Sequence, residues 1–163
     1  SLRGILLQGF SALELLIPPH NDSIEYLEAA RYHSPEQLGA IEAEPGATSD
    51  LYCLGMLLFK LLTGRDAYSA DNLRELLFAS VSCEVPDVRL LSPRVPRILN
   101  ALIQRLLRKS PADRYQSASA VRADLESIQA AVGSDEAMDA LVIGRHDQRQ
   151  SLAAPEFISR RGE

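Results

Sequence analysis

The sequence predicts a mainly α-helical fold, and two patterns carry that prediction. Residues 93–108 place apolar side chains at steps of three and four, which is the period of one helix face. Residues 50–63 are apolar on almost every face, as expected for a helix that is enclosed by protein on all sides. Residues 71–79 and 117–131 have the patterns of two further amphipathic helices. A chain of 163 residues is long enough for one domain with one core.

The N-terminal part is expected to be less helical. Residues 2–17 hold short apolar runs that end at two prolines, which favours a short strand or two joined by a turn. Residues 18–31 are polar and bounded by prolines, so we expect an exposed loop there.

Capping residues indicate where two helices begin. Ser34 is typical of a helix N-cap and Pro35 of the first helical position, and Gly39 predicts that this helix is brief. Thr48 or Ser49 can cap the long apolar helix that follows.

The sequence also contains three motifs in a fixed order. They are Tyr32-His33-Ser34-Pro35-Glu36-Gln37, then Ser49-Asp50-Leu51-Tyr52-Cys53-Leu54-Gly55 running on to Leu61-Leu62-Thr63-Gly64, and last Pro111-Ala112-Asp113-Arg114 within 106–118. Together they resemble the back half of the large lobe of a serine/threonine protein kinase. The resemblance covers roughly residues 1–132 and implies a protein-kinase-like large-lobe fragment. Such a fragment holds the end of the activation segment and the last four helices, and the small lobe is absent.

The resemblance implies a long-range ion pair. Ser34-Pro35-Glu36 is similar to the Ala-Pro-Glu that closes a kinase activation segment, and in the family this glutamate pairs with an arginine that Arg114 matches. A bidentate, charge-assisted pair of this kind would clamp the activation segment against the last helices.

Two positions of the long helix also match the family. Asp50 matches the aspartate that opens the central helix and reaches back to the backbone of the catalytic loop, and Gly55 fits the rest of the helix pattern. An acidic residue in a first helical turn is also stabilised by the helix dipole alone. Ala67 and Tyr68 stand where the family usually has Pro-Phe.

The residues that carry phosphoryl transfer in the family have no counterpart in these 163 residues. There is no glycine-rich phosphate loop, no strand lysine and no His-Arg-Asp catalytic loop. The metal-binding Asp-Phe-Gly is best matched by Gly9, Phe10 and Ser11, which offer no carboxylate to hold a metal ion. We therefore expect no catalytic residue, no metal and no cofactor in this chain. ATP and magnesium are expected only if the missing lobe and catalytic loop exist and are intact.

Charge and cysteine usage limit the partners and the compartment. The net charge of -5 argues against nucleic acid or an anionic membrane as a partner. The longest nearly uncharged stretch, 51–59, is too short to cross a bilayer. Cys53 and Cys83 sit in apolar helical patterns and are predicted to be reduced core thiols. These features favour a cytoplasmic protein.

The C-terminal tail is predicted to lie outside the kinase-like core. Residues 133–140 are small and acidic, which is typical of a linker. Leu141-Val142-Ile143-Gly144-Arg145 resembles the start of the ATPase module that follows a kinase-like domain in hybrid sensor kinases. The alternative is an irregular extension. The sequence therefore predicts a kinase-like segment at 1–132, a linker at 133–140, and either the start of an ATPase module or a disordered tail at 141–163.

Three functions remain open at this point. The first is a degenerate, pseudokinase-like domain that acts as a regulatory or interaction module, inactive by itself, beside other domains of a larger signalling protein and its protein partners. The second is a truncated piece of an active ATP-dependent serine/threonine kinase. The third is a helical interaction domain whose similarity to kinases arose by chance.

Overall fold

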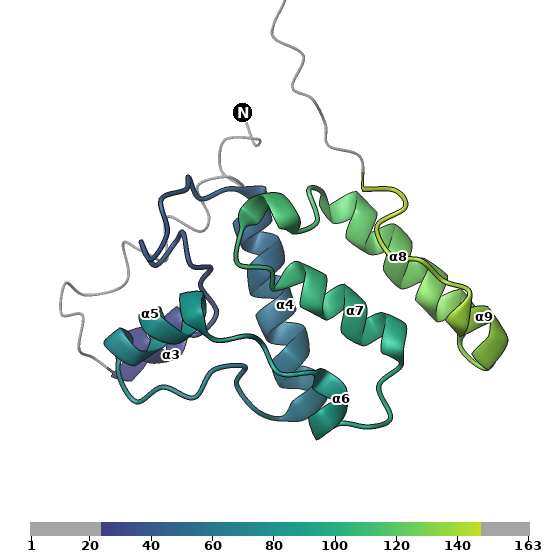
Figure 1. The fold of residues 1–163 in the computed structure, drawn as a ribbon, viewed down its shortest axis with the longest axis horizontal. Helices are drawn as coiled ribbons and strands as arrows, with labels where there is room; N and C mark the ends of the chain where they lie inside the picture. The colour runs from purple at the N-terminus through teal and green to yellow at the C-terminus, as the bar shows by residue number, and fades with distance from the viewer. Residues whose placement is uncertain (1–23, 148–163) are drawn as a thin grey trace, which may run out of the picture.

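The computed structural model describes residues 24–147, and every regular element among them is helical (Figure 1). This confirms the mainly α fold. The strands expected at 2–17, and with them Gly9, Phe10 and Ser11, lie outside the described residues. The elements in chain order are α3 (Ile24–Ala30), α4 (Ala47–Thr63), α5 (Leu73–Ser82), α6 (Val88–Leu91), α7 (Arg97–Leu106), the 3₁₀ turn η1 (Pro111–Asp113), α8 (Ala118–Ala131) and α9 (Asp135–Asp139).

Helix α4 is the centre of the fold. It packs against α6 and α7, α7 packs against α8, and α8 packs against α9, so the helices follow one another across the molecule (Figure 1). The helix begins one turn earlier than predicted, because its N-cap is Gly46 rather than Thr48 or Ser49. It ends at Gly64, whose left-handed backbone (φ +71°) lets its N–H bind the carbonyl oxygen of Lys60 at 2.8 Å.

The core consists of two apolar clusters. The first joins α3 to α7 and the loop that contains Tyr68, and the second joins α4, α7 and α8. Leu58 of α4 packs against both clusters, as does Leu99 of α7. Gly55 allows the close crossing of α4 and α7, because an added Cβ would lie only 2.9 Å from the Cβ of Leu106.

The segment expected as an exposed loop is partly helical. Residues 24–30 form α3, and Ala30 at its end is buried in the first cluster with Tyr26 and Leu27 packed beside it. Because these three residues lie at helical spacing, one face of a short helix can reach the core. The helix was not predicted from the sequence because this apolar pattern is short and is surrounded by polar residues.

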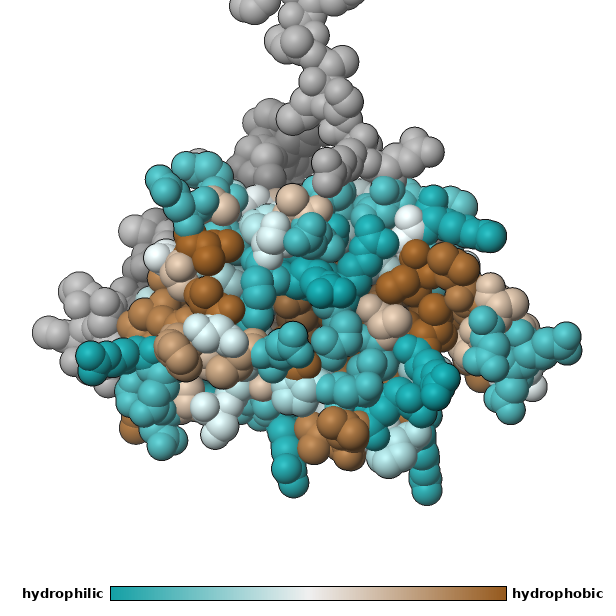
Figure 2. Space-filling model, viewed as in Figure 1, coloured by the Kyte–Doolittle hydropathy of each residue, from teal (hydrophilic) through white to brown (hydrophobic). Residues whose placement is uncertain are grey.

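Helix α4 is not enclosed on every side by the described residues, contrary to our expectation. Leu57 and Leu61, four residues apart and therefore on one side of the helix, are 47% and 79% exposed. Leu90 of α6 is 79% exposed, and Figure 2 shows apolar surface at the lower edge, where α6 lies. The prediction for Cys83 was also wrong, because it is exposed at the end of α5.

The first part of the tail packs on the core, which corrects the expected loose linker. Residues 135–139 form α9, and Met138, Leu141 and Ile143 pack against the second cluster. The described tail up to residue 147 thus belongs to the folded unit, while the identity of any module beyond it stays a prediction. None of the helices in 24–147 is long and apolar enough to cross a membrane.

Substitution of Leu58 tests whether α4 is the central element. Leu58→Asp places a charge without a partner between the two clusters and should prevent cooperative folding. Leu61→Asp changes an exposed position of the same helix and should alter the free energy of unfolding by about 0.5 kcal/mol or less. Circular dichroism during urea unfolding measures both, and a Leu58→Asp chain that melts like the parent would show that α4 is peripheral.

Candidate functional site

The first kinase-like motif forms a single capped turn. The backbone N–H of Ser34 donates to Oε1 of Gln37 at 2.9 Å, and the N–H of Gln37 donates to Oγ of Ser34 at 3.5 Å. This reciprocal pair is a capping box, with Pro35 buried directly after the cap. The turn ends at once at Gly39 (φ +68°), so the predicted brief helix is one hydrogen-bonded turn. Its position directs Glu36 into the interior.

Glu36 and Arg114 form the predicted clamp. Their side chains are fully buried, with Nη1 of Arg114 at 2.6 Å from Oε1 of Glu36 and Nη2 at 2.8 Å from Oε2. The other three N–H groups donate to backbone carbonyl oxygens, those of Thr48 (3.1 Å), Arg108 (2.7 Å) and Lys109 (2.9 Å). All donors of the guanidinium are therefore satisfied, which is what a buried charge requires.

The N-terminus of α4 is tied to the same carboxylate. Oγ of Ser49 donates to Oε1 of Glu36 at 2.7 Å and accepts the N–H of Gly46, the N-cap, at 3.0 Å. Burial by itself would raise the pKa of Glu36, but the hydrogen bonds from Arg114 and Ser49 outweigh it and lower that pKa to about 2. The carboxylate is thus ionised across the physiological range and joins three separate segments.

A row of polar side chains extends the clamp toward α5. The guanidinium of Arg114 lies 4.8 Å from the ring centre of Tyr52, whose hydroxyl is 3.4 Å from that of Tyr68. Nζ of Lys109 donates to the Tyr68 hydroxyl and lies 4.5 Å from the centre of its ring. Burial lowers the pKa of Lys109 to about 8. In the sequence, Tyr68 was noted only as a departure from the family pattern. Its extra hydroxyl was the feature that could have predicted this row of polar contacts.

Asp50 behaves differently from the clamp residues. It is exposed in the first turns of α4, and partial burial of its carboxyl raises its pKa. No donor for this carboxylate lies within 24–147, so its expected contact with a catalytic loop stays a prediction. The same part of the chain contains no group of three or more His, Cys, Asp or Glu residues that could hold a metal ion.

The sequence of this chain is similar to parts of several protein kinases. The chain is 43% identical over 95 residues to hybrid signal transduction histidine kinase G of Dictyostelium discoideum, covering 58% of this chain and 3% of that protein. It is 35% identical over 102 residues to serine/threonine-protein kinase PknL of Mycobacterium tuberculosis, covering 63% of this chain and 25% of that protein. No family model matches.

A solved structure shows the same fold. The twitchin kinase region of C. elegans superimposes with a TM-score of 0.54 at 21% identity, covering 71% of this chain and 19% of that one. The chain contains part of a protein kinase fold. Because it spans a quarter or less of the kinases named above, this kinase-like segment corresponds to only a small part of each. The buried pair of Glu36 and Arg114 holds the segment together.

The clamp should depend on the shape of arginine as well as its charge. Arg114→Met leaves Glu36 buried without its partner and should cost about 3–5 kcal/mol of unfolding free energy. Arg114→Lys should cost nearly as much, because an ammonium cannot reach both carboxylate oxygens and three carbonyls. Arg122→Met is the matched control, since Arg122 is exposed and forms a surface ion pair with Glu126; it should cost about 0.5 kcal/mol or less. Urea unfolding that ranks all three variants alike would contradict the clamp.

The clamp should also make the free energy of unfolding depend on pH in the acidic range. The pKa of Glu36 is lowered from 4.5 to about 2 in the folded chain, so its contribution is complete above about pH 4.5 and is lost as the pH falls toward 2. Glu36→Gln should therefore flatten the pH dependence of the unfolding free energy in that window. Glu42→Gln, at an exposed glutamate, should leave the dependence unchanged. Equal pH dependence in the parent and in Glu36→Gln, measured by urea unfolding from pH 2.5 to 6, would show that Glu36 is not the group responsible.

Proposed function

We propose that this chain is part of a degenerate, serine/threonine-protein-kinase-like domain that acts as a regulatory or interaction module in signal transduction. The observation that carries the proposal is that Gly9-Phe10-Ser11, the best match to the family's metal-binding Asp-Phe-Gly, offers no carboxylate to hold a metal ion. The buried pair of Glu36 and Arg114 keeps the kinase-like segment folded, and all five N–H donors of Arg114 are used within it.

The exposed apolar surface of α4 supports a role in which another protein domain packs against this helix. Leu57 and Leu61 expose apolar side chains along the central helix, and soluble domains rarely leave such a stripe uncovered. The relatives are far longer than this chain, and one of them is a hybrid signal transduction kinase, so further domains of a parent protein are the partners that we propose. A cytoplasmic location is part of the same proposal.

The second candidate is a truncated piece of an active kinase. The intact clamp and the 35% identity to a serine/threonine-protein kinase favour it. In that case ATP and magnesium would bind to a small lobe and a catalytic loop outside these 163 residues. Sequencing of the locus on both sides of this segment separates the two candidates. A strand lysine and a His-Arg-Asp loop followed by asparagine favour the active kinase, and their absence favours the regulatory module.

This chain should transfer no phosphate by itself, because no phosphate loop, phosphate-binding lysine or catalytic aspartate occurs in it. The purified chain is incubated with radiolabelled ATP, Mg²⁺ or Mn²⁺, and casein as acceptor. Incorporation should equal that of a heat-denatured sample. Asp50→Asn is the informative variant, since Asp50 is the exposed carboxylate of the motif that forms α4. Incorporation that this variant abolishes would assign activity to the chain and refute the proposal.

A further inference from the structure

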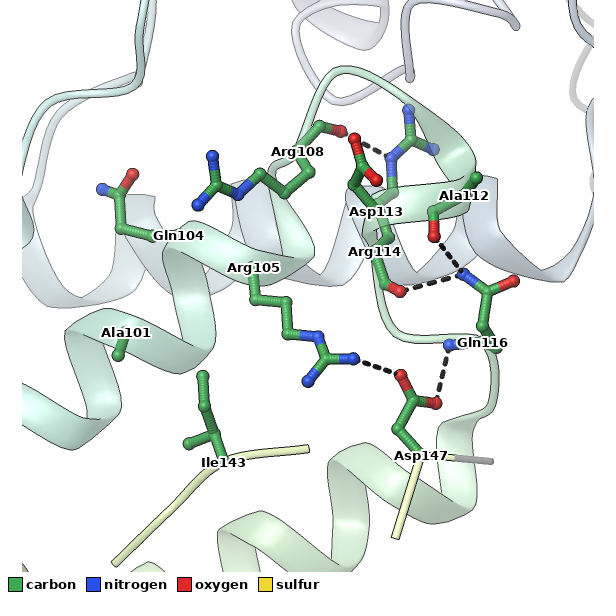
Figure 3. Close-up of a pocket in the computed structure, with 10 residues that line it drawn as sticks. All are labelled: Ala101, Gln104, Arg105, Arg108, Ala112, Asp113, Arg114, Gln116, Ile143 and Asp147. Carbon is green, nitrogen blue, oxygen red and sulfur yellow. Dashed lines mark hydrogen bonds and ion pairs between the residues drawn. The ribbon is translucent and has the colours of Figure 1, made fainter. Parts of the chain in front are cut away.

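The tail after α9 follows a defined path over the core. Residues 141–147, which we call the strap, run across α8 and reach the segment between η1 and α8 (Figure 1). Leu141 and Ile143 pack into the second apolar cluster, while Val142, Arg145 and His146 are exposed. A cleft of about 700 Å³ is lined by residues of α7 and η1 and by Ile143 and Asp147 of the strap (Figure 3).

The last described residue of the strap is held by two donors. The Asp147 side chain is only 1% exposed, and its Oδ2 accepts Nη2 of Arg105 at 2.6 Å. Its Oδ1 accepts the backbone N–H of Gln116 at 2.9 Å (Figure 3). One donor comes from α7 and the other from the segment after η1, so the core carries a site that binds a carboxylate in a fixed orientation.

Gly144 is required at the middle of the strap for two reasons. Its backbone is left-handed (φ +76°), and an added Cβ would lie 1.6 Å from Nη1 of Arg105. Its N–H donates to Oδ2 of Asp124 at 2.6 Å. The strap backbone and the Arg105 guanidinium therefore pack directly against each other, and a side chain at position 144 would have to displace the guanidinium.

The groups that receive the strap are themselves held in place. Asp124 is buried in α8 and also accepts the Tyr115 hydroxyl at 2.5 Å. The guanidinium of Arg105 lies 4.4 Å from the centre of the Tyr115 ring. This positions the acceptor for Gly144 and the donor for Asp147 as parts of one rigid arrangement on the core.

We propose that Arg105, Gln116 and Asp124 form a docking groove for a segment that turns at its glycine and has the pattern apolar–x–apolar–glycine–x–x–aspartate, occupied here by this chain's own residues 141–147. The inference goes beyond the proposed function and does not depend on it. The strap is held through one ion pair, two backbone hydrogen bonds and two apolar side chains, so it can leave the groove while α4 stays folded. When docked, it makes the chain depart from a fixed point beside η1.

Hydrogen exchange on the full 163-residue chain tests the docking. Asp147→Asn should raise the exchange rates of amides in 141–147 by about tenfold or more, because it removes the charge from a buried hydrogen-bonded pair. Gly144→Ala should raise them further. The amides of α4 should not change in either variant, which also shows that the variants fold.

Two control variants separate docking from general effects. Asp139→Asn removes an exposed acid of α9, and Gly64→Ala introduces the same backbone strain where an added Cβ meets no atom within 4 Å. Neither should change exchange in the strap. The proposal is overturned if the strap of the parent chain exchanges like an unstructured peptide, if Asp147→Asn has no effect, or if α4 amides accelerate with those of the strap.

A peptide tests the groove as a receptor. A fluorescent synthetic peptide of residues 138–147 is titrated into the full-length Gly144→Ala chain, whose own strap is released. Saturable binding is expected, with the peptide that carries Asp147→Asn binding at least about tenfold more weakly. The parent chain, with its groove occupied, should bind less peptide than the variant. Absence of binding to the folded variant, or equal binding of the two peptides, would overturn the proposal.

Discussion

The buried pair of Glu36 and Arg114 is the interaction on which the rest of the structure depends. The two residues are 78 positions apart, and their contact closes a loop that contains α4, α5, α6 and α7. An isolated ionised arginine is too costly to bury, so the backbone carbonyls of the surrounding loops must meet its remaining donors. Those carbonyls belong to two segments, the start of α4 at Thr48 and the turn after α7 at Arg108 and Lys109. A single cation thus orders several loops that have little apolar surface of their own.

The clamp continues into a row of polar side chains formed by Tyr52, Tyr68 and Lys109. Tyr68 brings a hydroxyl into a position where the family usually has a phenylalanine, and this hydroxyl meets both Tyr52 and Lys109. The hydroxyl satisfies an amine that burial has made easier to deprotonate. Since the backbone oxygen of Lys109 also accepts from Arg114, the same residue connects the clamp to the end of α5.

The two ends of the described chain show where local patterns are insufficient. Residues 24–30 looked like a polar loop, and 133–147 like a linker with the start of another module, yet both pack on the core. In each case a few apolar residues reach a surface that only the folded helices create. The strap, which lies in the part predicted as the start of another module or a disordered tail, includes the two residues, Gly144 and Asp147, that the core binds most specifically. The composition of a segment indicates how much apolar surface it can bury by itself. It does not indicate whether another part of the chain offers a surface on which the segment can pack.

The sequence by itself determined the helical class, the four long helices, the capped turn at Ser34 and the pairing of Glu36 with Arg114. Helical period and capping are local, and the pairing was implied by the resemblance to protein kinases. Only the tertiary structure decided the role of Tyr68, the exposure of one side of α4 and the docking of the strap. These features depend on which surfaces meet in three dimensions. An apolar helix has the same sequence pattern whether or not a neighbour covers it, and the need for glycine at position 144 becomes visible only when Arg105 is seen to lie against it.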